Sequence, residues 1–242
     1  MRLQVKLEMN TNWLIKDYRR IFMSLIKSVF SAYDPILYVN LYGTEEEKRK
    51  VNKPFTFSLH FPAFKGINGN RIDCGNEVSL FFSSDNETLV TAFYNGLEKR
   101  KEIVIGENYP INFKTTAIRL LPFKMINTDK VIFKTLSPIL VNQRNDNLMF
   151  IPPTHPDFDS EFKYILLNQT QEFNVSCKEN DVKIEIHSMK RLPLTHYNQT
   201  MTSWLGEFTM QAPKEVLQLV FDTGIGVRRS QGFGMLEIQK QF

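Results

Sequence analysis

The chain opens with a strict alternation of apolar and polar residues. Over residues 2–9 every second side chain is apolar, which is the period of a strand with one buried face. Over residues 14–30 the apolar side chains recur at intervals of three and four, which predicts an amphipathic helix with Asn12 as its N-cap. The N-terminal part is therefore predicted to form a half-buried strand followed by a helix.

The rest of the first half completes a familiar order of elements. The expected segments are a short helix at 34–43, strands at 53–61 and 77–83, a turn at 68–70, a helix at 86–101, and a last strand that begins at 102–106 and continues after Pro110. The order β-α-β-β-α-β is the split βαβ, ferredoxin-like plan. The first half is predicted to be one such unit.

The second half repeats this order of elements. The expected segments are a strand at 131–136, a helix at 158–167, strands at 183–189 and 200–210, a helix from Pro213 to its stop at Gly224, and a closing strand at 233–238. The residues themselves show no clear repeat, so the duplication rests on element order alone. The fold class is predicted to be α+β, with two tandem ferredoxin-like domains at 1–124 and 125–242.

Composition narrows the class of protein. With 42% hydrophobic and 23% charged residues in 242 positions, the chain is typical of a globular protein. Its apolar runs are far shorter than the roughly 18 residues of a membrane span, and its N-terminus alternates rather than forming a signal core. Cys74 and Cys177 lie too far apart to suggest a disulfide framework. We expect a cytoplasmic protein without a membrane partner. The net charge of +4 weakly favours anionic partners.

A glycine-rich segment at 224–234 holds four of the chain's 11 glycines. Glycine permits tight turns, and backbone amides flanked by arginines can cradle a phosphate. The candidate anion-binding residues are Gly224, Gly226, Arg228, Arg229, Ser230, Gly232 and Gly234. The order helix, loop, strand is the reverse of a nucleotide-binding loop, which excludes the usual nucleotide motifs. The alternative is a glycine-rich turn with solvated arginines.

The same segment resembles the C-terminal glycine-rich motif of the repeat-associated (RAMP) proteins. More narrowly, it is similar to the CRISPR precursor-RNA endoribonucleases, the "Cas six" family. Three other places carry the resemblance: the N-terminal strand and helix, the segment 53–58, and the segment 133–139. The resemblance therefore runs along most of the chain.

This resemblance implies a metal-independent ribonuclease without a cofactor. Its substrate is CRISPR repeat RNA, and the attacking group is the RNA's own 2′-hydroxyl, which leaves a 2′,3′-cyclic phosphate. Such chemistry needs a base, an acid and positive charge at the phosphorane. Proteins of a CRISPR effector complex are further candidate partners, and a homodimer is left open.

The resemblance also implies three candidate catalytic residues. Tyr42 occupies the position of the family histidine, Lys53 matches the family lysine, and Tyr33 is the second tyrosine. The basic residues at 48–50 lie nearby in sequence. A phenol with a pKa of about 10 is a poor base at neutral pH, so Tyr42 also favours an alternative: a repeat-RNA-binding protein that cuts weakly or not at all.

The other reactive side chains carry no motif. For each of the four histidines we expect a structural role, and His60 is the strongest exception because it follows the Lys53 segment. His196 is expected in a loop at a strand edge. No His/Cys/Asp/Glu cluster has metal-ligand spacing, so no metal is predicted. A third reading is a ferredoxin-like protein unrelated to RNA.

Overall fold

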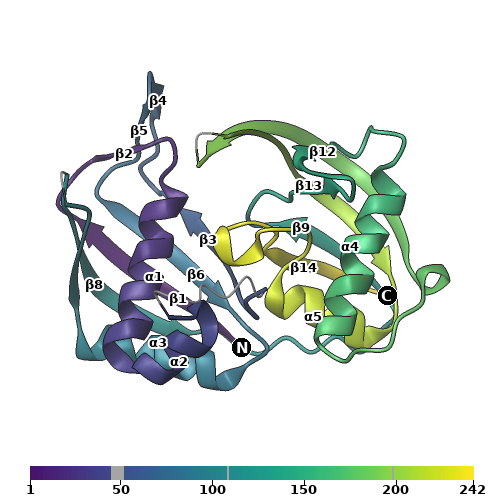
Figure 1. Cartoon of the computed structure of the whole chain (residues 1–242), viewed down its shortest axis with the longest axis horizontal. Coiled ribbons are helices and arrows are strands. Elements are labelled where there is room, and N and C mark those ends of the chain that lie inside the picture. Colours follow the sequence, from purple (N-terminus) through teal and green to yellow (C-terminus); the bar gives the residue numbers. More distant parts are fainter. Residues whose placement is uncertain (45–51, 108, 198) are drawn as a thin grey trace. The chain divides into compact units, whose positions relative to one another are not determined.

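The chain is described by a computed structural model that covers residues 1–44, 52–107, 109–197 and 199–242 (Figure 1). It divides into two compact units, Met1–Pro122 and Phe123–Phe242. The expected boundary between residues 124 and 125 lies close to this division. The basic residues 48–50, which the sequence suggested as helpers of the site, fall outside the described residues.

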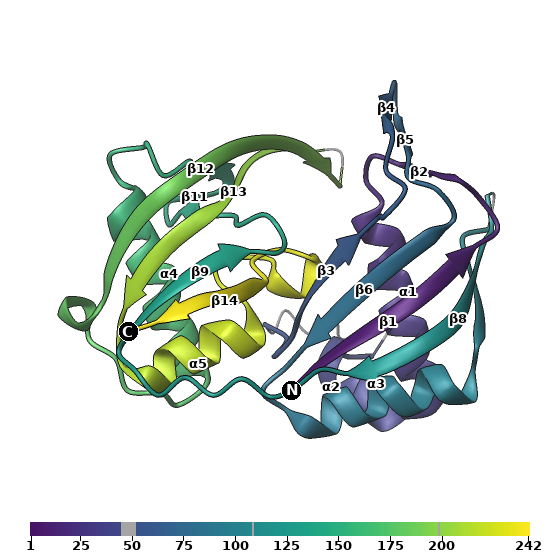
Figure 2. The same cartoon turned by 180° about the vertical axis from the view of Figure 1, so that it is seen from behind.

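The first unit is a five-stranded antiparallel sheet in the order β3-β6-β1-β8-β7, with helices on one face (Figure 2). Its main elements are β1 (Arg2–Met9), α1 (Arg19–Tyr33), α2 (Pro35–Tyr42), β3 (Thr56–His60), β6 (Glu77–Ser83), α3 (Glu87–Lys99), β7 (Glu102–Ile105) and β8 (Ile111–Leu120). The first strand lies between β6 and β8, which is the strand arrangement of a ferredoxin-like unit. The fold predicted for the first half is confirmed.

The core of this unit lies between the sheet and the helices. The alternation of β1 buries its apolar side chains on one face, where Val5 is fully buried. Helix α1 packs against α3 at Gly96, where an added Cβ would lie 2.6 Å from the Val29 Cγ1 atom. Asn86 caps α3 by accepting hydrogen bonds from the amides of the helix's first turn. Both the strand and the capped helix follow directly from the sequence pattern.

The first helix begins later than predicted. Residues 13–15 form a short strand, β2 (Trp13–Ile15), which joins β4 (Gly66–Asn68) and β5 (Arg71–Asp73) in a small three-stranded sheet. Leu14 is fully buried and is paired with Ile72. The carbonyl of Asn12 accepts hydrogen bonds from the amides of residues 74 and 75, so its predicted role as helix N-cap is wrong. A distant strand pairing thus overrides the local helical spacing.

The second unit repeats the arrangement with a four-stranded sheet in the order β12-β13-β9-β14. Its elements are β9 (Lys130–Thr135), β10 (Asn142–Gln143), β11 (Asp146–Phe150), α4 (Phe158–Glu172), the 3₁₀ turn η1 (Glu179–Asp181), β12 (Lys183–His196), β13 (Gln199–Gln211), α5 (Lys214–Thr223), the 3₁₀ turn η2 (Arg229–Gln231) and β14 (Leu236–Gln241). Phe133, Trp204 and Phe208 are fully buried in its core. The duplication expected from element order is confirmed as a fold.

The long hairpin of β12 and β13 extends well beyond the predicted strands. The strand predicted at 183–189 continues past Pro193, because β12 is an edge strand, where a missing backbone donor is tolerated. The strand continues to His196, whose side chain is fully buried. The expected loop position of this histidine is therefore wrong.

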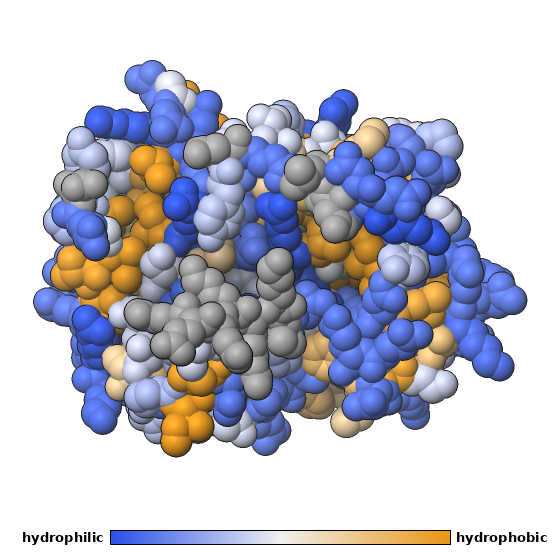
Figure 3. Space-filling view, viewed as in Figure 1, coloured by the Kyte–Doolittle hydropathy of each residue, from blue (hydrophilic) through white to orange (hydrophobic). Residues whose placement is uncertain are grey.

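The surface is mostly hydrophilic, with exposed apolar side chains in small separate groups on the face drawn in Figure 3. Helix α2 contributes Ile36 and Val39 to the exposed apolar residues. Among the described residues, no helix combines the length and the apolar character needed to cross a bilayer.

Candidate functional site

Helix α2 places Tyr42 at its C-terminal end. Asp34 caps the start of this helix, where its Oδ1 atom accepts a hydrogen bond of 2.9 Å from the Leu37 amide, and Pro35 occupies the first turn. The helix ends at Gly43, whose φ of +80° is readily reached by glycine. Tyr42 therefore has a fixed position on the first unit.

The structure brings Tyr42 and Lys53 together. The Lys53 Nζ atom lies 4.8 Å from the centre of the Tyr42 ring, and the Lys27 Nζ atom of α1 lies 5.1 Å from the same point. The Tyr38 ring, one helical turn before Tyr42, is 5.0 Å away from the Tyr42 ring. We call these four residues the Tyr42 cluster.

Burial sets the proton affinities in the Tyr42 cluster. Burial, with a smaller contribution from Tyr38, raises the pKa of the Tyr42 phenol. The ammonium groups lie over the ring, where they contact its π electrons. Burial, assisted by the positive charge of Lys27, lowers the pKa of Lys53. Tyr42 therefore stays a neutral phenol at physiological pH, whereas Lys53 releases its proton more readily than an ordinary lysine.

Tyr33, the third predicted catalytic residue, is turned toward α3. Its hydroxyl accepts a hydrogen bond of 3.0 Å from the Asn95 amide group, and its Cβ atom lies near Gly96. The contacts that the structure describes for Tyr33 are made with α3, and none joins it to the Tyr42–Lys53 pair. The geometry thus brings together two of the three predicted residues.

The glycine-rich segment of the second unit is folded back on its own backbone. The amides of Gly224, Gly232 and Gly234 donate to the carbonyls of Val220, Arg229 and Pro138 respectively. These three amides are therefore not available to an anion, and the predicted amide cradle is wrong for them. The segment acts first as a packing element.

Two of the glycines are required by close backbone contacts. A Cβ at Gly234 would lie 1.9 Å from the carbonyl oxygen of Ile225, and one at Gly226 would lie 2.5 Å from that of Leu140. Both glycines also have positive φ. Packing of Gly226 against Leu140 and of Gly234 against Ile225 therefore explains these glycines without a ligand.

The two arginines differ in exposure. Arg229 is 6% exposed, and its Nη2 atom lies 3.8 Å from the Glu172 carboxylate, so it is an internal residue. Arg228 is half-buried; it donates a 3.2 Å hydrogen bond to the Gln199 side chain and lies 5.0 Å from the centre of the Phe150 ring. Burial lowers the pKa of Arg228. Of the two guanidinium groups, only that of Arg228 is partly open to solvent.

His196 ties the long hairpin to the glycine-rich segment. Its Nε2 atom is 2.9 Å from the Gln231 Oε1 atom, and its ring packs edge-on to Phe233. The role of His196 is structural, as expected for an isolated histidine.

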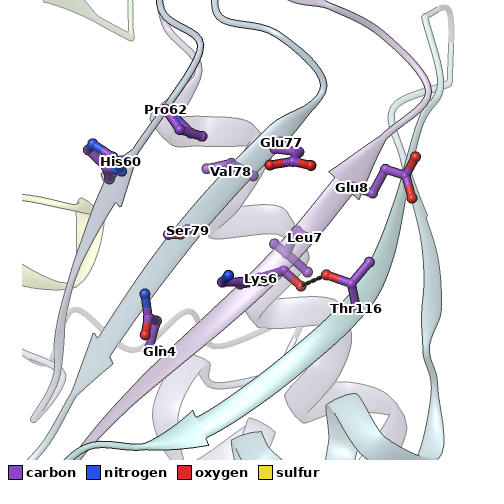
Figure 4. A pocket seen from close by; sticks show the side chains of 10 residues that line it. All are labelled: Gln4, Lys6, Leu7, Glu8, His60, Pro62, Glu77, Val78, Ser79 and Thr116. Carbon is purple, nitrogen blue, oxygen red and sulfur yellow. Dashed lines mark hydrogen bonds between the residues drawn. The ribbon is translucent and has the colours of Figure 1, made fainter.

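His60 lines a hollow of about 570 Å³ on the open face of the first sheet (Figure 4). Lys6, Glu8 and Glu77 also line it, so its charge is mixed. His60 is exposed, although its apolar strand had suggested a structural position. It lies four strand residues beyond Thr56, which is roughly 13 Å of extended chain, and Lys53 precedes that strand. His60 is therefore not part of the Tyr42 cluster.

Within the described residues, no group of three His, Cys, Asp or Glu side chains is arranged to hold a metal ion. Burial raises the pKa of both Cys74 and Cys177, which makes them poor nucleophiles.

Comparison with known proteins shows that this chain is similar to CRISPR-associated proteins. A model of the family described as CRISPR associated protein Cas6, C-terminal, matches residues 121–238. A putative CRISPR-associated endoribonuclease-like protein Cas6 of Pyrococcus furiosus is 28% identical over 169 residues, which cover 67% of this chain and 68% of the relative. Residues 121–238, most of the second unit, therefore match the Cas6 family, and the relative from Pyrococcus furiosus extends the similarity to two thirds of the chain. The Cas6 model spans the glycine-rich segment and ends within β14.

Solved structures agree with the Cas6 fold over the whole chain. A Cas6-related protein of Pyrococcus furiosus has a TM-score of 0.81 at 23% identity and covers 100% of this chain and 99% of its own. A RAMP protein described as binding different RNA substrates has a TM-score of 0.80 at 23% identity, with 99% and 100% covered. These similarities establish the fold with its two ferredoxin-like domains.

Two members of the Tyr42 cluster were not found from the sequence. Tyr38 precedes Tyr42 by four residues, a helical spacing that brings side chains together, so a signal was present. Lys27 has no such signal. Its place in the cluster arises from the packing of α1 beside α2, which no local pattern encodes.

Proposed function

We propose that this chain binds CRISPR repeat RNA and cleaves it at a site built around Tyr42 and Lys53, without a metal ion. The observation that carries the proposal is the Lys53 ammonium group 4.8 Å from the centre of the Tyr42 ring. It places a cation beside a phenol at the positions implied by the family motif. The name of the Pyrococcus furiosus relative, which is endoribonuclease-like, supports the same activity.

In the proposed reaction the 2′-oxygen of the RNA attacks the adjacent phosphorus. A new bond forms between that oxygen and phosphorus, and the bond to the 5′-oxygen breaks. The products are a 2′,3′-cyclic phosphate and a 5′-hydroxyl, so the 2′-hydroxyl loses one proton and the leaving oxygen gains one. No redox partner or metal is needed for this balance.

Lys53 is the residue best suited to assist this step. As an ammonium it stabilises negative charge on the phosphorane and can protonate the leaving oxygen. Its lowered pKa makes it a better proton donor than an ordinary lysine. The neutral Tyr42 hydroxyl can donate a hydrogen bond to a phosphate oxygen, but its raised pKa prevents it from acting as the base.

We assign part of the RNA contact to the glycine-rich segment. Arg228 and Ser230 are only partly buried, and they remain the candidates there for phosphate contacts. The four glycines shape this loop, and Arg229 supports it from inside. A CRISPR effector complex and a homodimer remain further proposed assemblies.

The raised pKa of Tyr42 favours a second candidate function. A site with a cation and a hydrogen-bond donor can bind a phosphate, yet the Tyr42 phenol, the described residue at the position of the family histidine, does not serve as a base for the 2′-hydroxyl. The second candidate is a repeat-RNA-binding protein that cuts slowly or not at all.

The test uses purified protein with repeat RNA of its own host in EDTA. The matched substrate carries a 2′-deoxy nucleotide at the mapped cut site. We expect cleavage of the first RNA alone, and a rate that falls roughly 10- to 1,000-fold in Lys53→Ala because phosphorane stabilisation is lost. Lys99→Ala, at an exposed lysine of α3, is the control variant.

The remaining outcomes separate the two candidates. Tight binding of both RNAs without cleavage would favour the binding protein, and a gain of activity in Tyr42→His would then identify a degenerate catalytic site. Failure to bind any repeat RNA at low salt would contradict both functions.

A further inference from the structure

Lys27 is drawn into the Tyr42 cluster from a different part of the chain. It lies inside α1 beside the buried residue Ile26, and its own side chain is half-buried. Its ammonium group is 5.1 Å from the centre of the Tyr42 ring, nearly as close as that of Lys53. Two cations from separate elements thus converge on one phenol.

This convergence of two positive charges costs electrostatic free energy. Like charges in a partly buried position disfavour each other's charged forms, and Lys27 contributes to the lowered pKa of Lys53. In the part of the chain that the structure describes, no carboxylate pairs with Lys27. An anion that contacts both ammonium groups would remove this repulsion.

We infer that Lys27 is a second phosphate-contacting residue, so that one RNA phosphate is bound by the ammonium groups of Lys27 and Lys53 and by the Tyr42 hydroxyl. The inference rests on the proposed function. The inference adds Lys27 to that site and specifies that two ammonium groups contact the bound phosphate. A phosphate suits the position because several of its oxygens can each accept a hydrogen bond at once.

The alternative role for Lys27 is packing alone, as a cation over the Tyr42 ring. Replacement by methionine keeps much of the apolar stem over the ring and removes the charge, whereas replacement by arginine keeps the charge. A packing role predicts a change in thermal stability without a change in the salt dependence of RNA binding.

The first measurement is the affinity for 2′-deoxy repeat RNA, which cannot be cleaved, as a function of salt. In Lys27→Met the negative slope of log affinity against log salt should become less steep by about 0.7, because one phosphate contact to single-stranded RNA is lost. Lys27→Arg should retain the wild-type slope. Lys99→Met, which removes an exposed lysine of α3, should also leave it unchanged.

The second measurement is the pH dependence of the same affinity. Lys53 is faced by Lys27 from α1 and by Tyr42 from α2, with Tyr38 next to Tyr42. Wild-type affinity should decline as rising pH removes the Lys53 proton, and this decline begins below the ordinary lysine value of about 10.4. Without Lys27 the decline should move to higher pH. This shift tests whether the charge of Lys27 acts on Lys53, whereas the salt slope tests whether Lys27 contacts the phosphate.

Each outcome has one meaning. An unchanged salt slope in Lys27→Met would overturn the inference, whether or not its pH profile or thermal stability changes. Lys53→Ala is measured in parallel. If Lys53→Ala weakens binding or cleavage while Lys27→Met does not, only the inference fails; if neither variant changes binding or cleavage, the proposed function of the site fails with it.

Discussion

The glycine-rich segment and the Tyr42 cluster show opposite relations between sequence and structure. The segment at 224–234 is the most conspicuous stretch of the sequence, yet many of its amides are used inside the second unit and Arg229 is buried. The Tyr42 cluster has only a modest motif, yet it gathers two lysines around a partly buried phenol. A conspicuous motif can therefore serve packing, while a chemical site can form from scattered residues.

The difference follows from what each residue type signals. A dense run of glycines indicates that another backbone segment approaches closely, and that segment can belong to the same chain. A lysine in the sequence does not indicate which residues will surround it, because its neighbours are set by the packing of distant elements. The first signal is local, and the second is created by tertiary structure.

The largest effect is expected for Gly234→Ala. The new Cβ would lie 1.9 Å from the Ile225 carbonyl oxygen at a φ of +72°, so the segment must shift. We expect a loss of at least about 3 kcal/mol in the free energy of unfolding of the second unit. Urea denaturation followed by the fluorescence of buried Trp204, in a Trp13→Phe background, measures it.

Gly69→Ala is the matched control for this prediction. Gly69 also has positive φ, +55°, but an added Cβ meets nothing within 4 Å. Its loss should be only about 1 kcal/mol, which is the conformational cost alone. An equal loss in the two variants would contradict the packing explanation of the glycine-rich segment.

The next effect separates the two neighbouring arginines. Arg229→Met removes the ion pair between Arg229 and Glu172 and should cost about 2 kcal/mol, since Glu172 itself is partly exposed. The salt slope of RNA affinity should not change. Arg228→Met should lower the free energy of unfolding by less than about 1 kcal/mol. It should also make the negative salt slope less steep by about 0.7, the contribution of one phosphate contact. Denaturation and salt titration of both variants test this, and the reverse pattern would contradict the assignment.

The smallest effect concerns the helix that carries Tyr42. Asp34→Ala removes the side-chain cap of α2 and should cost about 1 kcal/mol. Asp34→Asn keeps a capping oxygen and should stay near the wild type. If Tyr42 contacts RNA, loosening α2 should also weaken repeat binding, whereas Asn86→Ala, which removes the cap of α3, should affect stability alone. Equal RNA affinities of the Asp34→Ala and Asn86→Ala variants would contradict the placement of the site.

The sequence by itself determined the repeated ferredoxin-like plan. Strands such as β1 and β6 occupy the predicted residues, and α3 lies within the helix predicted at 86–101. These features depend on the spacing of neighbouring residues and on local hydrogen bonds, which a single sequence displays. The family resemblance likewise selected Tyr42 and Lys53, which the structure then placed in contact.

Tertiary structure alone decided the rest. The pairing of Leu14 with Ile72 turned the expected start of a helix into a strand. The close approach of the backbone at Ile225 and Gly234 assigned amides of the glycine-rich segment to internal bonds. The packing of α1 beside α2 brought Lys27 to Tyr42. Each depends on contacts between residues far apart in the chain, and local periodicity carries no information about such contacts.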